Sequence, residues 1–248
     1  MRFILLALTL FLTAIAPALA QGEGVAVVPD LSAAGRFDFK AEVDRRYGRT
    51  LEVIRAEFPR DHAALMAEIA AIKWQRGGEN DALLAAFGAV TELKKKYAAR
   101  LQFAPSAKQA VMLENLAKFY VAVSGREGPE VCGQFASDGA GVLFARGLSG
   151  AYAAAIDIQS AAYFEAVAAA LETPEYISPV RPDDWGVVVS AMVSAGAPPS
   201  FAKTISDGNP ADPDLCPALA AMFVTSAVLN APEGTRIRAD FAKNLAGY

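Results

Sequence analysis

The sequence predicts an all-α protein of about ten helices. Apolar residues recur every three or four positions through most of the chain, which places them on one face of a helix. Gly and Pro residues separate these periodic stretches and mark helix ends. Hydrophobic residues make up 54% of the 248 positions and charged residues 20%. That composition excludes a disordered chain and supplies a core for one sizeable domain.

The first 20 residues have the pattern of a signal peptide. Arg2 precedes an apolar stretch, residues 3–15, that is short for a bilayer span, and Pro17 precedes a small-x-small cleavage site at residues 18–20. We therefore expect a periplasmic or secreted protein with no transmembrane segment after cleavage. Residues 21–36 lack a helical period and are expected to form an N-terminal arm before an all-helical domain over residues 37–248.

The first half of this domain predicts an antiparallel bundle of four amphipathic helices. Short connections separate them, and Pro59 stops the first. Ser106 and Gln109 have the spacing of a capping box at the start of the fourth, and Gly125 ends it. The predicted ranges are 38–58, 61–76, 80–101 and 106–125. The apolar face of the first helix comprises Val43, Tyr47, Leu51, Ile54 and Phe58.

The second half is more apolar and more acidic than the first. Residues 36–130 hold 16 Lys+Arg and 13 Asp+Glu, a net charge of +3, whereas residues 131–230 hold 3 and 10, a net charge of −7. We expect one domain in which the N-terminal bundle packs on a more apolar C-terminal helical layer, with a candidate subdivision near residue 128. The helices expected in this half are 129–135, 138–147, 149–171, 183–195, 201–207, 217–230 and 235–245.

The chain has two cysteines, Cys132 and Cys216, and export makes them a predicted disulfide. The loop between them spans 84 positions, for which the loop-entropy relation gives on the order of 4–5 kcal/mol of stabilisation. Pro217 fits the first helical position and places Cys216 at a helix N-cap. A reactive Cys216 thiolate is the alternative, although neither cysteine has the C-x-x-C spacing of a redox site.

The candidate binding residues lie on the long helix predicted from Ser149. Asp157, Gln159 and Ser160 fall beside or within its apolar stripe, where polar groups need partners when buried. Two interpretations remain open at this stage. Either these side chains form hydrogen bonds to a neighbouring helix, or they provide a polar lining in an apolar pocket.

Other chemistry has weaker support. A hydrolase would need a second carboxylate beside Asp157, and Asp138, Glu165 and Glu172 are the candidates. His62 is the only histidine, so no metal site of the usual His and Cys spacing is expected, and no cofactor motif is present. The acidic loop 207–214 lacks the pattern of a calcium loop. The basic run at 94–96, with Arg100, is expected to be a solvated helix face, and no nucleic-acid binding is expected.

These observations favour an exported, non-catalytic helical protein that binds a partner protein or a small apolar ligand in the cell envelope. The alternative is a helical hydrolase acting on cell-wall glycan or peptide, with Asp157 as one of its acids. The sequence identifies no catalytic residue beyond that and does not predict the oligomeric state.

Overall fold

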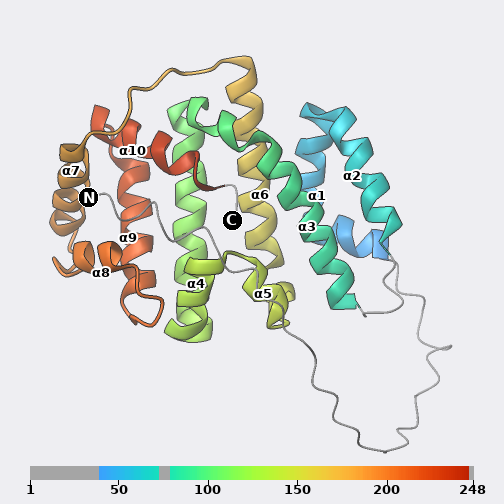
Figure 1. Ribbon diagram of the computed structural model, residues 1–248, viewed down its shortest axis with the longest axis horizontal. Helices are drawn as coiled ribbons and strands as arrows, with labels where there is room; N and C mark the ends of the chain where they lie inside the picture. Colours follow the sequence, from blue (N-terminus) through green and yellow to red (C-terminus); the bar gives the residue numbers. More distant parts are fainter. Residues whose placement is uncertain (1–38, 73–78, 246–248) are drawn as a thin grey trace, which may run out of the picture. The chain divides into compact units, whose positions relative to one another are not determined.

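Ten α-helices and one short 3-10 helix, η3, make up residues 39–72 and 79–245, the part of the chain that the computed structural model describes (Figure 1). These two ranges contain no strand and form a single compact helical domain, so the predicted all-α class is confirmed. The predicted signal peptide and N-terminal arm lie outside the described residues, as do Gly77 and Gly78. The elements are α1 (Phe39–Glu57), α2 (Pro59–Ala71), α3 (Glu79–Tyr97), η3 (Ala98–Phe103), α4 (Ser106–Asp138), α5 (Gly141–Ala145), α6 (Ser149–Glu172), α7 (Pro182–Ser194), α8 (Phe201–Asp207), α9 (Leu215–Val228) and α10 (Pro232–Ala242).

Helix α1 buries the whole apolar face that its sequence predicts, from Val43 to Phe58. It is not continuous, however. Tyr47 has non-helical backbone angles (φ −123°, ψ 23°), which divide α1 into two segments. Because a helix segment leaves its first backbone N–H groups without partners inside the helix, the second segment needs acceptors from elsewhere. Pro59 ends α1 and also serves as the first residue of α2, a position where its missing N–H is not needed.

Helix α4 is also divided, at Gly128. This glycine has φ +83°, a conformation that other residues rarely adopt, and Pro129 follows it. The predicted boundary between residues 125 and 129 is therefore present as a break within α4. Both segments are well buried, through Met112 to Val123 before the break and through Val131 to Phe135 after it.

The core is organised around α4, which packs extensively against α9 and also against α6. Phe119 contacts the Tyr152 ring of α6 (5.9 Å between centroids), and Tyr120 contacts the Phe223 ring of α9 (5.7 Å). Phe135, beyond the α4 break, packs on both of these α4 aromatic rings. Helix α1 packs mainly against α6. Helix α6 thus lies between α1 and α4, so the fourth helix of the predicted bundle packs mainly on α9 and α6.

The Cys132–Cys216 disulfide joins α4 to the first turn of α9 and confirms the predicted pairing. The two Cα atoms are 6.2 Å apart, and both residues are buried. Gly133, beside the bridge, lies so close to the Pro210 carbonyl that a Cβ there would be 1.8 Å from the oxygen. The disulfide therefore closes a tightly packed contact, and a free Cys216 nucleophile is not present in this fold.

Three helix starts differ from the prediction. The residue before α4 is Pro105, and Ser106 and Gln109 do not form the predicted capping box. Asp214 occupies the N-cap position of α9, so Cys216 is the second helical residue instead of the N-cap. Helix α10 begins at Pro232, not near residue 235. At the start of α4, the Ser106 backbone N–H donates to the Glu175 carboxylate (3.0 Å), a partner distant in sequence that local patterns do not reveal.

Helix α6 is long and apolar enough to cross a bilayer by length and composition alone. Its apolar character has a simpler explanation in this fold, because 61% of its most apolar 18-residue window is buried within the domain. It lies between α1 and α4 as a core helix.

We expect the double substitution Cys132→Ser with Cys216→Ser to lower the free energy of unfolding by about 2–5 kcal/mol, because the unfolded chain regains the freedom of a long loop. Urea denaturation of the oxidised protein and the variant measures the difference. As a control, a reducing agent should destabilise the native protein and leave the variant unchanged. Equal stability of the oxidised protein and the variant would contradict this expectation.

Candidate functional site

Asp157 faces the second segment of α1. Its carboxylate accepts hydrogen bonds from the backbone N–H groups of Arg49 (3.1 Å) and Thr50 (2.8 Å) and from the Thr50 hydroxyl (2.7 Å). These amides follow the break at Tyr47 and lack acceptors within their own helix. Asp157 therefore caps a helix segment from a different helix, with its negative charge at the positive end of the segment dipole. This contact is the helix–helix hydrogen bond that the sequence allows.

Gln159 and Ser160 are buried, but they do not form one lining with Asp157. At 100° per residue, Ser160 lies within about 60° of Asp157 around α6, whereas Gln159 lies about 160° away. The Gln159 Oε1 atom has no hydrogen-bond partner among the described residues. The structure thus separates the three candidate binding residues onto two sides of α6, and binding of a ligand by them stays a prediction.

The other candidate carboxylates are distant from Asp157 or differently engaged. Along α6, Glu165 and Glu172 are eight and fifteen residues further on, or about 12 and 22 Å at 1.5 Å per residue. Paired glycosidase carboxylates lie about 5–9.5 Å apart. Glu165 also forms an ion pair with Lys108 of α4 (3.0 Å), and Asp138 is exposed at the end of α4. This arrangement does not favour the hydrolase alternative.

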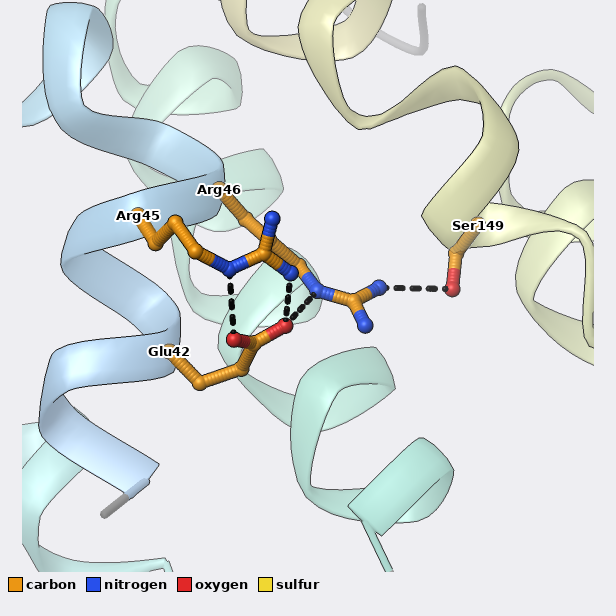
Figure 2. Close-up of polar contacts among 4 residues, drawn as sticks. All are labelled: Glu42, Arg45, Arg46 and Ser149. Carbon is orange, nitrogen blue, oxygen red and sulfur yellow. Dashed lines mark hydrogen bonds and ion pairs between the residues drawn. The ribbon is translucent and has the colours of Figure 1, made fainter. Parts of the chain in front are cut away.

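A charged cluster that the sequence analysis missed connects α1 to the start of α6 (Figure 2). Glu42 accepts hydrogen bonds from the guanidinium groups of Arg45 and Arg46, and Arg46 donates to the Ser149 hydroxyl (3.3 Å). The two arginines lower the pKa of Glu42 to about 2. The i,i+4 spacing of Glu42 and Arg46 was a usable signal, but the contact with Ser149 was not visible in the sequence. The cluster fixes α1 on α6.

A second ion pair joins α7 to α10. Arg236 donates two hydrogen bonds to the buried Asp184 carboxylate (2.8 and 2.6 Å), and the Arg181 backbone N–H donates a third (2.7 Å). Arg236 and these hydrogen bonds lower the pKa of Asp184 to about 2. The i,i+4 spacing of Arg236 and Asp240 would by itself favour a pair on the outer face of α10, but this pair does not form. Arg236 instead faces α7, and Asp240 pairs with Lys243 (2.8 Å).

Arg238 occupies the junction of α4, α9 and α10, where it is only 5% exposed. It donates to the backbone carbonyls of Ser226 (2.8 Å) and Leu229 (2.9 Å) and to the Ser106 hydroxyl (2.7 Å). A cation at this place offsets the negative end of the α9 dipole. Burial lowers the pKa of Arg238, although the guanidinium stays protonated at any ordinary pH. Arg238 holds the C-terminal end of α9 on the start of α4, opposite the end that the disulfide closes.

The basic run of α3 does not form one solvated face. Lys95 pairs with Glu92 (2.7 Å) and Lys96 with Asp61 of α2 (2.6 Å). Lys94, however, is buried, with its ammonium nitrogen 5.6 Å from the centre of the Tyr163 ring. The Tyr163 hydroxyl donates to the Lys94 backbone carbonyl. Burial lowers the pKa of Lys94 to about 7, so this side chain is partly neutral at physiological pH.

The acidic loop between α8 and α9 is ordered by its own turns. The Asn209 side chain accepts from the Ala211 backbone N–H (3.1 Å), and the Asp212 carboxylate accepts from the Asp214 backbone N–H (2.9 Å). Asp207 pairs with Lys203. Among residues 39–72 and 79–245, no group of three or more His, Cys, Asp or Glu side chains is placed to hold a metal ion.

The outward face of α9 is apolar along its whole length. Residues 218–230 are mostly apolar on every side, a pattern typical of a buried central helix, but one stripe of α9 reaches the surface. Pro217, Ala221, Val224 and Val228 follow each other at spacings of four, three and four residues, which places them in one row. The side chains of Val224 and Val228 are 45% and 59% exposed. We call these four residues the α9 stripe.

Comparisons with protein-family models, with curated proteins and with solved structures find no match to this chain.

Replacing Asp157 with alanine should lower the free energy of unfolding by about 2–4 kcal/mol, because the buried Thr50 amide and the part-buried Arg49 amide lose this acceptor. Thr50→Val should cost less, and the double variant should show a coupling of about 1–3 kcal/mol. Glu165→Ala, which removes a half-exposed ion pair on the same helix, is the control and should cost under about 1 kcal/mol. Urea denaturation of the native protein and the four variants measures these differences in the free energy of unfolding. A fully stable Asp157→Ala variant would show that the cap is dispensable.

Lys94 makes stability depend on pH. Its pKa is about 7 in the folded protein and near the usual 10.5 when unfolded, so between these values the folded protein binds fewer protons. Stability should therefore rise with pH across this window, and the penalty should be complete below pH 7. Lys94→Met should be more stable than the native protein at pH 6, by up to a few kcal/mol, with the difference shrinking by pH 9. Parallel pH curves for Lys94→Met and the exposed control Lys95→Met would refute this.

Proposed function

We propose that this protein is an exported, non-catalytic binding protein of the cell envelope that binds a helix of a partner protein on the α9 stripe. The observation that carries the proposal is the uncharged row formed by Pro217, Ala221, Val224 and Val228, in which Ala221 is half-buried and the other three are exposed. A straight row at helical spacing is complemented best by a second helix laid along it, as in other helix–helix contacts.

The chemistry of the partner follows from the charges around the stripe. Asp212 and Asp214 precede α9, and residues 131–230 carry a net charge of −7. Lys203 offsets Asp207 but is the only basic residue between Arg181 and Arg236. The complementary surface is therefore an apolar helix with Lys or Arg at the end that lies near Asp214. Attraction between these charges speeds association and orients the partner. Added salt should screen this attraction and slow association.

The buried polar groups support a binding role over a catalytic one. Asp157 and Arg238 each pair with the end of a neighbouring helix segment, and Asp184 caps its own helix while it binds Arg236 of α10. Glu42 holds Arg46, which donates to Ser149 of α6. These contacts stabilise the scaffold that presents α9. The small apolar ligand is less well supported than a protein, because the stripe lies on the outward surface of a helix, whereas ligand sites are concave. A helix of fourteen residues is about 21 Å long and gives a contact at the small end of the range for specific interfaces, so binding should be weak and reversible.

A photoreactive amino acid at position 224 tests the proposal in exporting cells. We expect one discrete crosslinked product, whose partner peptide is an apolar helix with Lys or Arg near Asp214. Adding Val228→Asp should reduce its yield about tenfold, since it buries a charge in the contact. The same photoreactive residue at position 193 is the matched control, because Val193 of α7 is similarly exposed (40%) but lies off the stripe.

Three outcomes would contradict the proposal. These are no discrete product from position 224, the same product from position 193, and a yield that Val228→Asp does not change. A product with the mass of two copies of this chain would replace the partner protein with self-association.

A further inference from the structure

The link between α6 and α7 is an extended strap, residues 173–181, on the protein surface. Seven of its nine residues are exposed, and only Ile177 and Val180 are half-buried. Tyr176 is 84% exposed, the highest value among the large apolar side chains of the described residues. Pro174 and Pro179 favour extended backbone at and before their positions.

Between its two ends, the strap is attached to the domain through Glu175 and Tyr176. The Glu175 backbone N–H donates to the Phe103 carbonyl (2.8 Å), and the Glu175 carboxylate accepts from the Ser106 backbone N–H at the start of α4 (3.0 Å). The Tyr176 ring lies against the Phe103 ring, with 5.5 Å between their centres. By contrast, the loop between α8 and α9 is folded into turns and packs its Pro210 carbonyl on Gly133.

We propose that the strap is a proteolytic processing site, cut after Tyr176 by an endoprotease that selects large aromatic residues. Proteases bind several residues of substrate in extended form, and exposed connections are the usual places where a folded protein is cut. This strap is already extended and exposed, so no helix has to unfold. The bond after Tyr176 is followed by Ile177, whereas the bonds after Thr173, Ser178 and Arg181 are each followed by proline, which has no N–H and a fixed ring.

The reaction is hydrolysis of one peptide bond. The Tyr176–Ile177 C–N bond breaks, and water supplies a hydroxyl group to the Tyr176 carbonyl carbon and a proton to the Ile177 nitrogen. The products are a new carboxylate at Tyr176 and a new ammonium group at Ile177, with a net gain of one water.

The two products would remain one molecule. Cys132 lies before the cut and Cys216 after it, so the disulfide joins residues 1–176 to residues 177–248. The same two parts are held together without covalent bonds by the α4–α9 contact and by Arg238, which donates to Ser106 across the cut. Processing would therefore convert the protein into a disulfide-linked, two-chain form with α9 still packed on α4.

Limited digestion of the oxidised full chain with chymotrypsin tests the proposal. We expect an early product that is 18 Da heavier than its parent and stays as one band without reductant. With reductant it should separate into two fragments, one of which begins at Ile177. The rate should not change in urea concentrations below the unfolding transition, because cutting of the native strap does not require unfolding.

Three variants locate the bond and the bridge. Tyr176→Ser and Ile177→Pro should each slow the appearance of the Ile177 terminus at least about tenfold, through loss of the aromatic residue and of the scissile N–H respectively. Cys132→Ser with Cys216→Ser should give two fragments on a denaturing gel without reductant. Failure of the Ile177 terminus to appear would overturn the proposal, as would its appearance only at urea concentrations that unfold the chain.

Discussion

The contact between α4 and α9 is the interaction on which the rest of the fold depends. The disulfide closes it at the start of α9, and Arg238 closes it at the other end by binding the last carbonyls of α9 and the Ser106 hydroxyl. The two closures differ in kind, because one constrains the unfolded chain and the other compensates a helix dipole. Helices α6 and α10 also pack against α4, so their positions follow from this pair.

A common principle explains the buried polar residues. Helix ends and breaks expose backbone groups that must be paired, and here the pairing groups come from other helices. Asp157 of α6 accepts from backbone N–H groups of α1, and Arg238 of α10 donates to the last carbonyls of α9. Glu175 of the strap accepts from the first backbone N–H of α4. A polar residue on an apolar helix was therefore evidence of a distant helix end, and not by itself evidence of a ligand. Three atoms are exceptions, because Gln109 Oε1, Gln159 Oε1 and Ser226 Oγ are buried without a hydrogen-bond partner among the described residues.

The sequence allowed prediction of the helices, the apolar face of α1 and the Cys132–Cys216 bridge, because these depend on periodicity, on helix-breaking residues and on there being only two cysteines. It did not allow prediction of the partners of Arg236 or the burial of Lys94, because both depend on which helices become neighbours. A lysine in a basic run is typical of a solvated helix face, whereas the fold packs Lys94 against the Tyr163 ring. The sequence did not predict the exposed side of α9 for the same reason, since an all-apolar helix gives no indication of which side faces outward.

The α9 stripe and the strap are supported by different contacts, so cleavage of the strap need not change binding at the stripe. The strap leaves α6 and reaches α7, whereas the α9 stripe is supported by α4, the disulfide and Arg238. None of these supports includes the Tyr176–Ile177 bond. Cutting that bond releases the α7 end of the strap, while Glu175 keeps its contact with the start of α4 from the other side of the cut. The two-chain form should therefore keep the stripe presented as before, and any change in binding would have to come through α7, which packs on α9 and α10.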